Sequence, residues 1–588
     1  MEFLNNLSRL FIYDPAEPLV FSSGSFMLLF IVFLTIYNII YKRKILVSIY
    51  VVLFSFLFYY KSAGIYVWLL AFTTLYTYYS GFLLKNVKEE FYRKLAVFVG
   101  ISIPLLLLGF FKYTNFIVFN LNQIIDSNFA FIEVALPVGI SFYTFQSISY
   151  IIDLYRKRVE PADNILDFAF YLTFFPQLVA GPIVKANLFL PQLKQTPVVT
   201  PQMAYSGLWL IILGLFKKAV IANYIAQYND LIFEAPQNYS GFENLMAVFG
   251  YALQIFCDFS GYSDMAIGIG KIMGYDLGIN FLSPYKSTTI SDFWRRWHIS
   301  LSSWLKEYVY IPLGGNREIS KFSVYSIPVI LILASAITCP ILYTVSMLII
   351  SLLGLYTYFK RSSLFTVITL ALSTVLAVSL YFQSVITAVM LSVCIVTWLI
   401  AIAFPDTTRM IKTCINQLLT MLIGGLWHGS SWSFVFWGAG HGVALCIDKI
   451  LKKVLPETKL VKTIQWIFTF IIVLFLWLFF RAKDITIQTE TATTLVSAFD
   501  VPFLMLNRIF TDMDFSFFVH FWDARCLWVV LVVFGFTCHF LPENFTTKVQ
   551  DIFVKSNILV KILVLLVVIQ LVVQFQGSTV QPFIYFDF

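Results

Sequence analysis

The residues best suited to chemistry in this chain are its histidines, of which there are only five. Three of them, His298, His428 and His441, lie near tryptophan, glycine or serine in or beside apolar segments. A polar imidazole inside a bilayer should face a cavity or a partner, and its reference pKa of about 6.5 suits it to take up and return a hydroxyl proton. Taken singly, each histidine is better explained as a buried side chain bonded to a backbone carbonyl.

The surroundings of His428 favour a chemical role. Residues 424–429 read Gly-Gly-Leu-Trp-His-Gly, and such small residues permit close approach of a neighbouring helix or a substrate chain. His441 follows 13 residues later, which is not a whole number of helical turns, so the two imidazoles need not share a helix face. No metal site is expected, because the sequence has no H-x-x-x-H or H-E-x-x-H motif.

The elements that position these histidines must be membrane helices. The 588 residues are 59% hydrophobic and only 12% charged, whereas soluble chains carry about 25% charged residues. Runs of about 20 mostly apolar residues match the thickness of a bilayer core. Barrel strands would alternate polar and apolar residues, but residues 26–34 are apolar at every position. The sequence therefore predicts an all-α polytopic membrane protein.

The basic residues predict the orientation of these helices. They stand in short clusters beside the apolar runs, as at Lys42 to Lys44, so the net charge of +8 indicates cytosolic anchors and not a nucleic-acid surface. Ser25 to Ile40 is expected to be a first spanning helix and not a cleaved signal peptide. Counting two spans between successive clusters places both termini outside the cytosol, including the tail at residues 576–588. No linker divides the chain, so residues 1–588 are expected to form a single transmembrane domain.

Two stretches differ from ordinary spans. Tyr275 to Arg317 interleaves basic and aromatic residues, which predicts amphipathic helices at an interface or bending into the protein; a simple scaffold anchor is the alternative. Residues 322–405 hold only Lys360 and Arg361 as charges and are long enough for two helical hairpins, with plausible turns at Pro340 and at Gln383. This block is predicted to be an insertion.

Six motifs in consistent order resemble those of the membrane-bound O-acyltransferase (MBOAT) superfamily. They occupy residues 136–146, 174–183, 258–266, 293–301, 312–317 and 427–429. Within the superfamily the chain most resembles the bacterial alginate O-acetyltransferase membrane subunit and related enzymes that acylate exported polymers. The likeness covers most of residues 95–450 and the C-terminal tail. It implies a ring of tilted helices around a funnel, with re-entrant or interfacial helices. The block at 322–405 departs from the family pattern.

The resemblance also implies a chemistry. An acyl group, expected to be acetyl from cytosolic acetyl-CoA, would cross the membrane for O-acetylation of a cell-surface or exported polysaccharide, with a separate extracytoplasmic acyltransferase as partner. His428 matches the family's catalytic histidine, and its expected role is the base that deprotonates the acceptor hydroxyl. The expected location is the bacterial cytoplasmic (inner) membrane.

Secondary roles follow as hypotheses. His298, which falls where many eukaryotic members have Asn, would hold the acyl carbonyl or orient His428. A water-poor chamber would be lined by Trp294, Trp297, Trp427 and Ser430, with Asp258 and Asp264 on its polar path, although hydrogen bonding between helices explains the two aspartates equally well. In the aromatic tail, Tyr585 would accept the acyl group before passing it on; an interfacial anchor or docking peptide is the alternative.

Two other functions compete with acyl transfer. A transporter of a lipid-linked or acylated molecule would also carry intramembrane charges around a polar path, although no inverted repeat with paired broken helices is evident. A catalytically inactive scaffold for an envelope enzyme is the third possibility. It would be favoured if removal of His428 left the cellular product unchanged.

Overall fold

The protein is almost entirely helical. The structure, a computed structural model, describes residues 10–15, 17–317, 341–360, 409–488 and 493–575, with a few isolated positions between 320 and 373. Within these residues seven helical stretches are long and apolar enough to cross a membrane: Lys44–Asn86, Glu90–Ile125, Pro201–Glu234, Trp432–Lys452, Lys459–Arg481, Phe517–Phe540 and Ile558–Phe575. The prediction of an all-α polytopic protein is confirmed.

The chain divides into two compact units. The first comprises Met1–Lys112, Val134–Ser302 and Thr463–Phe588, and the second comprises Tyr113–Glu133 and Ser303–Lys462. His298 belongs to the first unit, whereas His428 and His441 belong to the second.

The N-terminal part of the first unit is held together by aromatic side chains. Helix α2 (Gly24–Ile40) begins at Ser23, whose hydroxyl accepts a hydrogen bond from the Phe26 amide at 3.2 Å. It is followed by α3 (Lys44–Ala63), α4 (Val67–Asn86) and α5 (Glu90–Ile125). The ring of Phe175 lies within 6.5 Å, centroid to centroid, of several rings on α2 and α3: Phe26, Phe30, Phe33, Phe54 and Phe58.

Short helices carry two of the sequence motifs into the interior. These are α6 (Ile140–Tyr155), α7 (Ile165–Thr173), α8 (Phe175–Leu178) and α9 (Ala186–Leu193). Every residue from Phe174 to Ile183 is buried. The motifs at 136–146 and 174–183 therefore contribute mainly to the core of this unit.

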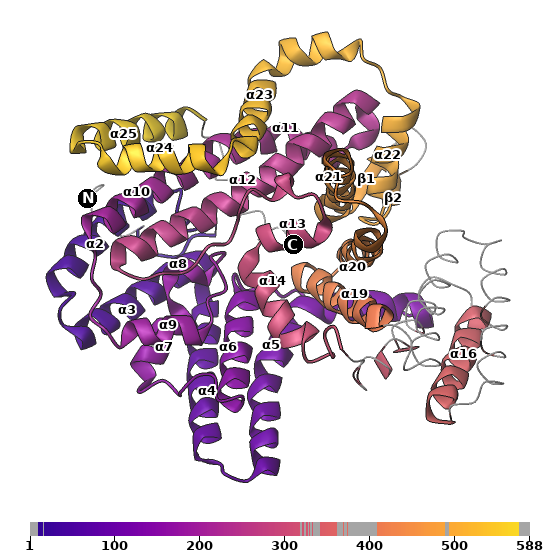
Figure 1. Cartoon of the computed structure of the whole chain (residues 1–588), viewed down its shortest axis with the longest axis horizontal. Helices are drawn as coiled ribbons and strands as arrows, with labels where there is room; N and C mark the ends of the chain where they lie inside the picture. The colour runs from indigo at the N-terminus through magenta and orange to yellow at the C-terminus, as the bar shows by residue number, and fades with distance from the viewer. Residues whose placement is uncertain are drawn as a thin grey trace. The chain divides into compact units, whose positions relative to one another are not determined.

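The first unit also contains a long pair of packed helices. Helix α10 (Pro201–Leu215) continues through a π-helical stretch (Phe216–Ala222) into α11 (Asn223–Glu234), and both α-helices pack along α12 (Gly241–Met273) (Figure 1). Helix α12 begins with a capping box, in which Ser240 and Glu243 bond each other's backbone amides.

The C-terminal part of the first unit contains the strands described in the chain. Helix α21 (Lys459–Arg481) leads to the antiparallel pair β1 (Ile485–Gln488) and β2 (Thr493–Val496), in which Ile485 faces Val496. Helices α22 (Val501–Thr511), α23 (Phe517–Phe540), α24 (Glu543–Lys555) and α25 (Ile558–Phe575) follow, and α24 and α25 pack on α10. The tail at 576–588 lies outside the described residues.

The second unit is built around two helices, α19 (Arg409–His428) and α20 (Trp432–Val454), which pack against each other (Figure 1). It also contains α16 (Ile341–Lys360). Most of the predicted insertion at 322–405 lies outside the described residues, so its two hairpins remain a prediction.

Candidate functional site

His428 is the last residue of α19, at a break between two helices. Residues 429–431 are non-helical, and α20 begins at Trp432 after an extended Ser431. The break follows from the sequence Gly-Ser-Ser, since glycine and serine are weaker helix formers than alanine or leucine. The imidazole at this helix end is only 2% exposed.

Two tryptophan rings pack against the imidazole of His428. The rings of Trp427 and Trp437 lie on it with centroid distances of 4.8 Å and 4.9 Å and interplanar angles of 80° and 81°. Trp437 also contacts His441, at 4.8 Å and 73°. Trp437 and His441 are four residues apart on α20 and so share a helix face. The indole of Trp437 therefore lies between the two imidazoles, and both histidines are buried.

Close packing of backbones holds this arrangement in place. A Cβ atom added at Gly425 would lie 2.3 Å from the Phe434 carbonyl oxygen, and one added at Gly438 would lie 2.3 Å from the Met421 carbonyl oxygen. Because real side chains do not approach backbone so closely, α19 and α20 can meet here only through glycine. The glycines beside His428 thus serve helix contact.

Helix α5 and the loop before the insertion brace the same region within the second unit. The Tyr113 hydroxyl donates a hydrogen bond to the Leu426 carbonyl at 2.6 Å, two residues before His428. The Trp432 indole donates to Asn120 at 2.9 Å. The Asn416 amide donates to the Gly315 carbonyl at 3.0 Å and joins α19 to the motif at 312–317.

His298 occupies a strained turn in the first unit. It lies between α13 (Ile290–Arg296) and α14 (Ile299–Leu305), with a φ of 42°, which is unusual for a residue with a side chain and is found preferentially at functional sites. Asn280 supports the turn, since its side chain accepts bonds from the Ser300 amide at 3.1 Å and hydroxyl at 2.9 Å.

The imidazole of His298 is enclosed by aromatic rings, including Phe259 at a centroid distance of 4.6 Å. Burial lowers the pKa of His298 to about 3, because removal from water disfavours the imidazolium. His298 is therefore neutral at physiological pH and suited to hydrogen bonding rather than to carrying charge.

The other predicted chamber residues have defined partners. Trp297 packs on Phe293 at 5.7 Å and on Trp477 at 5.0 Å, and Trp294 also contacts Phe293. Ser430 is half-buried in the break after His428. Lining of a chamber by Trp294, Trp297, Trp427 and Ser430 stays a prediction. Tyr585 lies outside the described residues.

Asp258 and Asp264 form ion pairs between helices. Asp258 pairs with Lys218, both at most 4% exposed, and Asp264 pairs with Lys217 at 2.7 Å. These contacts support the alternative of helix-to-helix bonding for the aspartates. The two lysines are residues that sequence reasoning missed, although a Lys-Lys pair inside the apolar run at 201–234 was an available signal.

Part of the chain matches the sequence model of a known protein family. Residues 162–335 match the model of the membrane-bound O-acyltransferase family.

Among the described residues, no group of three or more His, Cys, Asp or Glu side chains is arranged to hold a metal ion.

Similar proteins extend the match over nearly the whole chain. A probable alginate O-acetylase of Pseudomonas putida is 29% identical over 97% of this chain and 100% of its own length. The corresponding protein of Pseudomonas aeruginosa is 32% identical, covering 80% of this chain and 73% of the relative. A peptidoglycan O-acetyltransferase of Helicobacter pylori is 31% identical, covering 76% and 72% respectively.

Proposed function

Because the chain belongs to the membrane-bound O-acyltransferase family, we propose that it O-acetylates an exported or cell-surface polysaccharide, with His428 as the catalytic base. The observation that carries the proposal is the buried imidazole at the α19–α20 break, in a chain similar over 97% of its length to a probable alginate O-acetylase. The polymer acceptor is proposed because two relatives are named for alginate and peptidoglycan.

The proposed donor is cytosolic acetyl-CoA. The neutral imidazole of His428 takes the proton of the acceptor hydroxyl while the oxygen attacks the thioester carbonyl. A C–O ester bond forms, the C–S bond breaks, and the proton passes from the imidazolium to the leaving thiolate. The role proposed for His298, which burial keeps neutral, is to hold the acyl carbonyl or to orient His428.

Strain comparison tests the function. A strain lacking the chain is expected to lose ester-linked acetate from its envelope or secreted polysaccharide and to regain it when the gene is restored. The amount of polymer outside the cell should be unchanged. A fall in exported polymer, with unchanged acetate per sugar, would instead favour a transporter.

Trp437 is predicted to assist His428. We propose that its indole, which lies 4.9 Å from the imidazole at an interplanar angle of 81°, directs its ring face at His428; such a face stabilises a neighbouring cation by about 0.5–2 kcal/mol. Trp437→Leu should therefore slow acyl transfer by about 2- to 30-fold. Initial rates in membranes measure the effect.

A conservative variant and a distant control distinguish this role of Trp437 from a purely structural one. Trp437→Phe keeps an aromatic face and should retain most of the rate, and Trp522→Leu, at a 43% exposed tryptophan on α23, should match the native protein. A native rate in Trp437→Leu would contradict the role.

Tyr585 is proposed to carry the acyl group on the extracytoplasmic side and to pass it to a partner acyltransferase or to the sugar. The tail follows α25, whose last residue, Phe575, contacts the ring of Tyr224 at 5.4 Å. Tyr585→Phe keeps the aromatic ring and removes the hydroxyl, so a relay predicts loss of polymer acetylation, whereas an anchor predicts none. Mass spectrometry of the native tail should detect an acetyl ester on Tyr585. Full activity in Tyr585→Phe would exclude the relay.

A further inference from the structure

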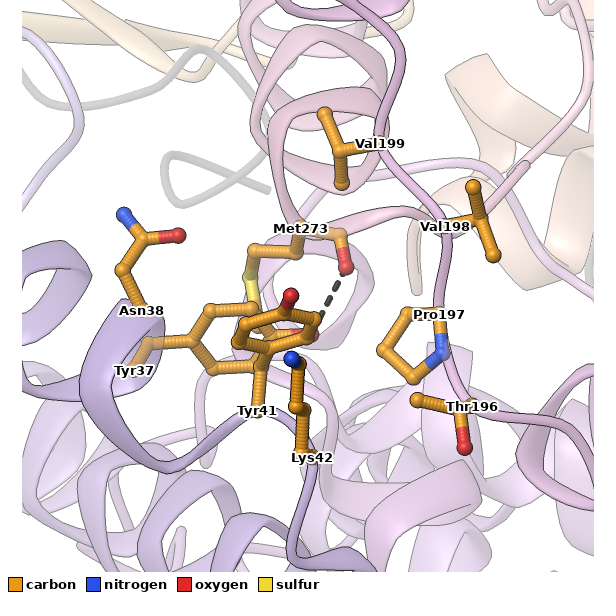
Figure 2. Close-up of a pocket in the computed structure, with 9 residues that line it drawn as sticks. All are labelled: Tyr37, Asn38, Tyr41, Lys42, Thr196, Pro197, Val198, Val199 and Met273. Carbon is orange, nitrogen blue, oxygen red and sulfur yellow. Dashed lines mark hydrogen bonds between the residues drawn. The ribbon is translucent and has the colours of Figure 1, made fainter.

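A cavity of about 610 Å³ lies in the first unit, and none of its described lining residues is a histidine (Figure 2). It is bounded by the last turn of α2 and the residue pair that follows, by residues 196–199 between α9 and α10, and by Met273 at the end of α12. Cavities of about 300–1,000 Å³ are typical of small-molecule sites.

Two walls of different character face each other across this cavity. On one side lie the rings of Tyr37 and Tyr41 with Met273 behind them, and on the other lie Pro197 and Val198 (Figure 2). The Tyr37 hydroxyl donates a hydrogen bond to the Met273 carbonyl at 2.7 Å, and both residues are almost fully buried. The Tyr37 ring is therefore a fixed part of this wall.

The charge at this site favours an anion. Lys42 lines the cavity, with its ammonium 5.8 Å from the ring centroid of Tyr41, and none of the nine described lining residues is acidic. Two other lysines near these elements are paired with carboxylates, Lys44 with Asp167 at 3.4 Å and Lys194 with Asp163 at 3.5 Å. Lys42 is thus the lining residue that would neutralise a negatively charged ligand.

The rim of the cavity indicates that this anion has an apolar part. Ile39 on α2 is 77% exposed and Val198 is 73% exposed. On a membrane protein, exposed aliphatic side chains on or beside apolar helices face acyl chains, while Tyr and Lys residues mark headgroup depth.

We propose that this cavity binds the headgroup of an anionic phospholipid from the leaflet that Lys42 faces. The phosphate lies beside the Lys42 ammonium, the glycerol region lies between the Tyr41 ring and Pro197, and the acyl chains run over Ile39 and Val198. Basic pockets at helix ends are suited to such lipids, and one lysine near a membrane surface contributes about 1 kcal/mol. The lipid joins α2, the 196–199 segment and α12.

Lipid retention tests the proposal on the purified full-length chain. Native mass spectrometry should show phosphatidylglycerol bound more tightly than phosphatidylethanolamine. Lys42→Gln should weaken phosphatidylglycerol binding about fivefold, Lys42→Arg should preserve it, and Val199→Trp, which fills the cavity, should reduce it. Lys548→Gln, at an exposed lysine of α24, is the matched control and should bind as the native chain does.

Soluble phosphates distinguish a lipid from a free ligand. Glycerol 1-phosphate and coenzyme A, added separately, should not displace bound phosphatidylglycerol, because they lack acyl chains. Displacement by either compound would overturn the lipid assignment in favour of a soluble phosphate site. Equal binding of the two lipids, or native binding in Lys42→Gln, would also overturn it.

Discussion

Replacement of His428 by alanine is expected to lower acyl transfer by a factor of about 10² to 10⁴, the usual contribution of a positioned general base. The variant should still fold. Trp427 and Trp437, the larger side chains at this place, are kept, and the α19–α20 contact depends on Gly425 and Gly438. The rate is measured as transfer of labelled acetate from acetyl-CoA in isolated membranes.

His520 provides the matched control for this prediction. It is an exposed histidine on α23, so His520→Ala should leave the rate unchanged. His428→Gln should behave like His428→Ala, since an amide retains hydrogen bonding but does not take up a proton. A native rate in His428→Gln would show that proton transfer by this residue is not required.

Lys218→Ala should destabilise the folded chain by about 3–5 kcal/mol, which is the cost of removing one partner of a buried ion pair and leaving the other charge buried. The ion pair of Lys218 and Asp258 connects the π-helical stretch Phe216–Ala222 with α12, and both residues are at most 4% exposed. Removing the ammonium leaves the Asp258 carboxylate inside the protein without the charge that balances it. The folded fraction is measured by thermal unfolding of the chain in detergent, followed by size-exclusion chromatography.

The neighbouring pair and a double variant give the controls. Lys217 and Asp264 are about 20% and 19% exposed, so Lys217→Ala should cost much less. Lys218→Met combined with Asp258→Met should recover most of the stability, because no buried charge is left unbalanced. A Lys218→Ala variant as stable as the native chain would contradict the importance of this pair.

The helical class and the close helix contact beside His428 could be predicted because they depend on local signals. Uninterrupted apolar runs identify membrane helices without knowledge of their partners, and the glycines before His428 predicted the close approach seen at Gly425. The short helices at 290–310, with buried Trp297 and Trp304, agree with the prediction for Tyr275 to Arg317 of helices bending into the protein.

Contacts between distant segments could not be predicted in the same way. Spacing along a continuous helix does not place His428 and His441 on one face, but the break at 429–431 begins a new helix whose Trp437 contacts both. Lys218 and Asp258 are 40 residues apart in sequence, and no local pattern specifies that they pair. The left-handed backbone of His298 likewise depends on Asn280.

The most direct test of the account is the amount of ester-linked acetate on envelope and secreted polysaccharide from cells that express the native chain, His428→Ala or His298→Ala at matched levels. We predict loss of acetate with His428→Ala, and a smaller or equal loss with His298→Ala. Unchanged acetate in cells with His428→Ala would contradict the central claim that this imidazole catalyses acetylation of the polymer, and would favour a different acyl group, an inactive scaffold or a transporter.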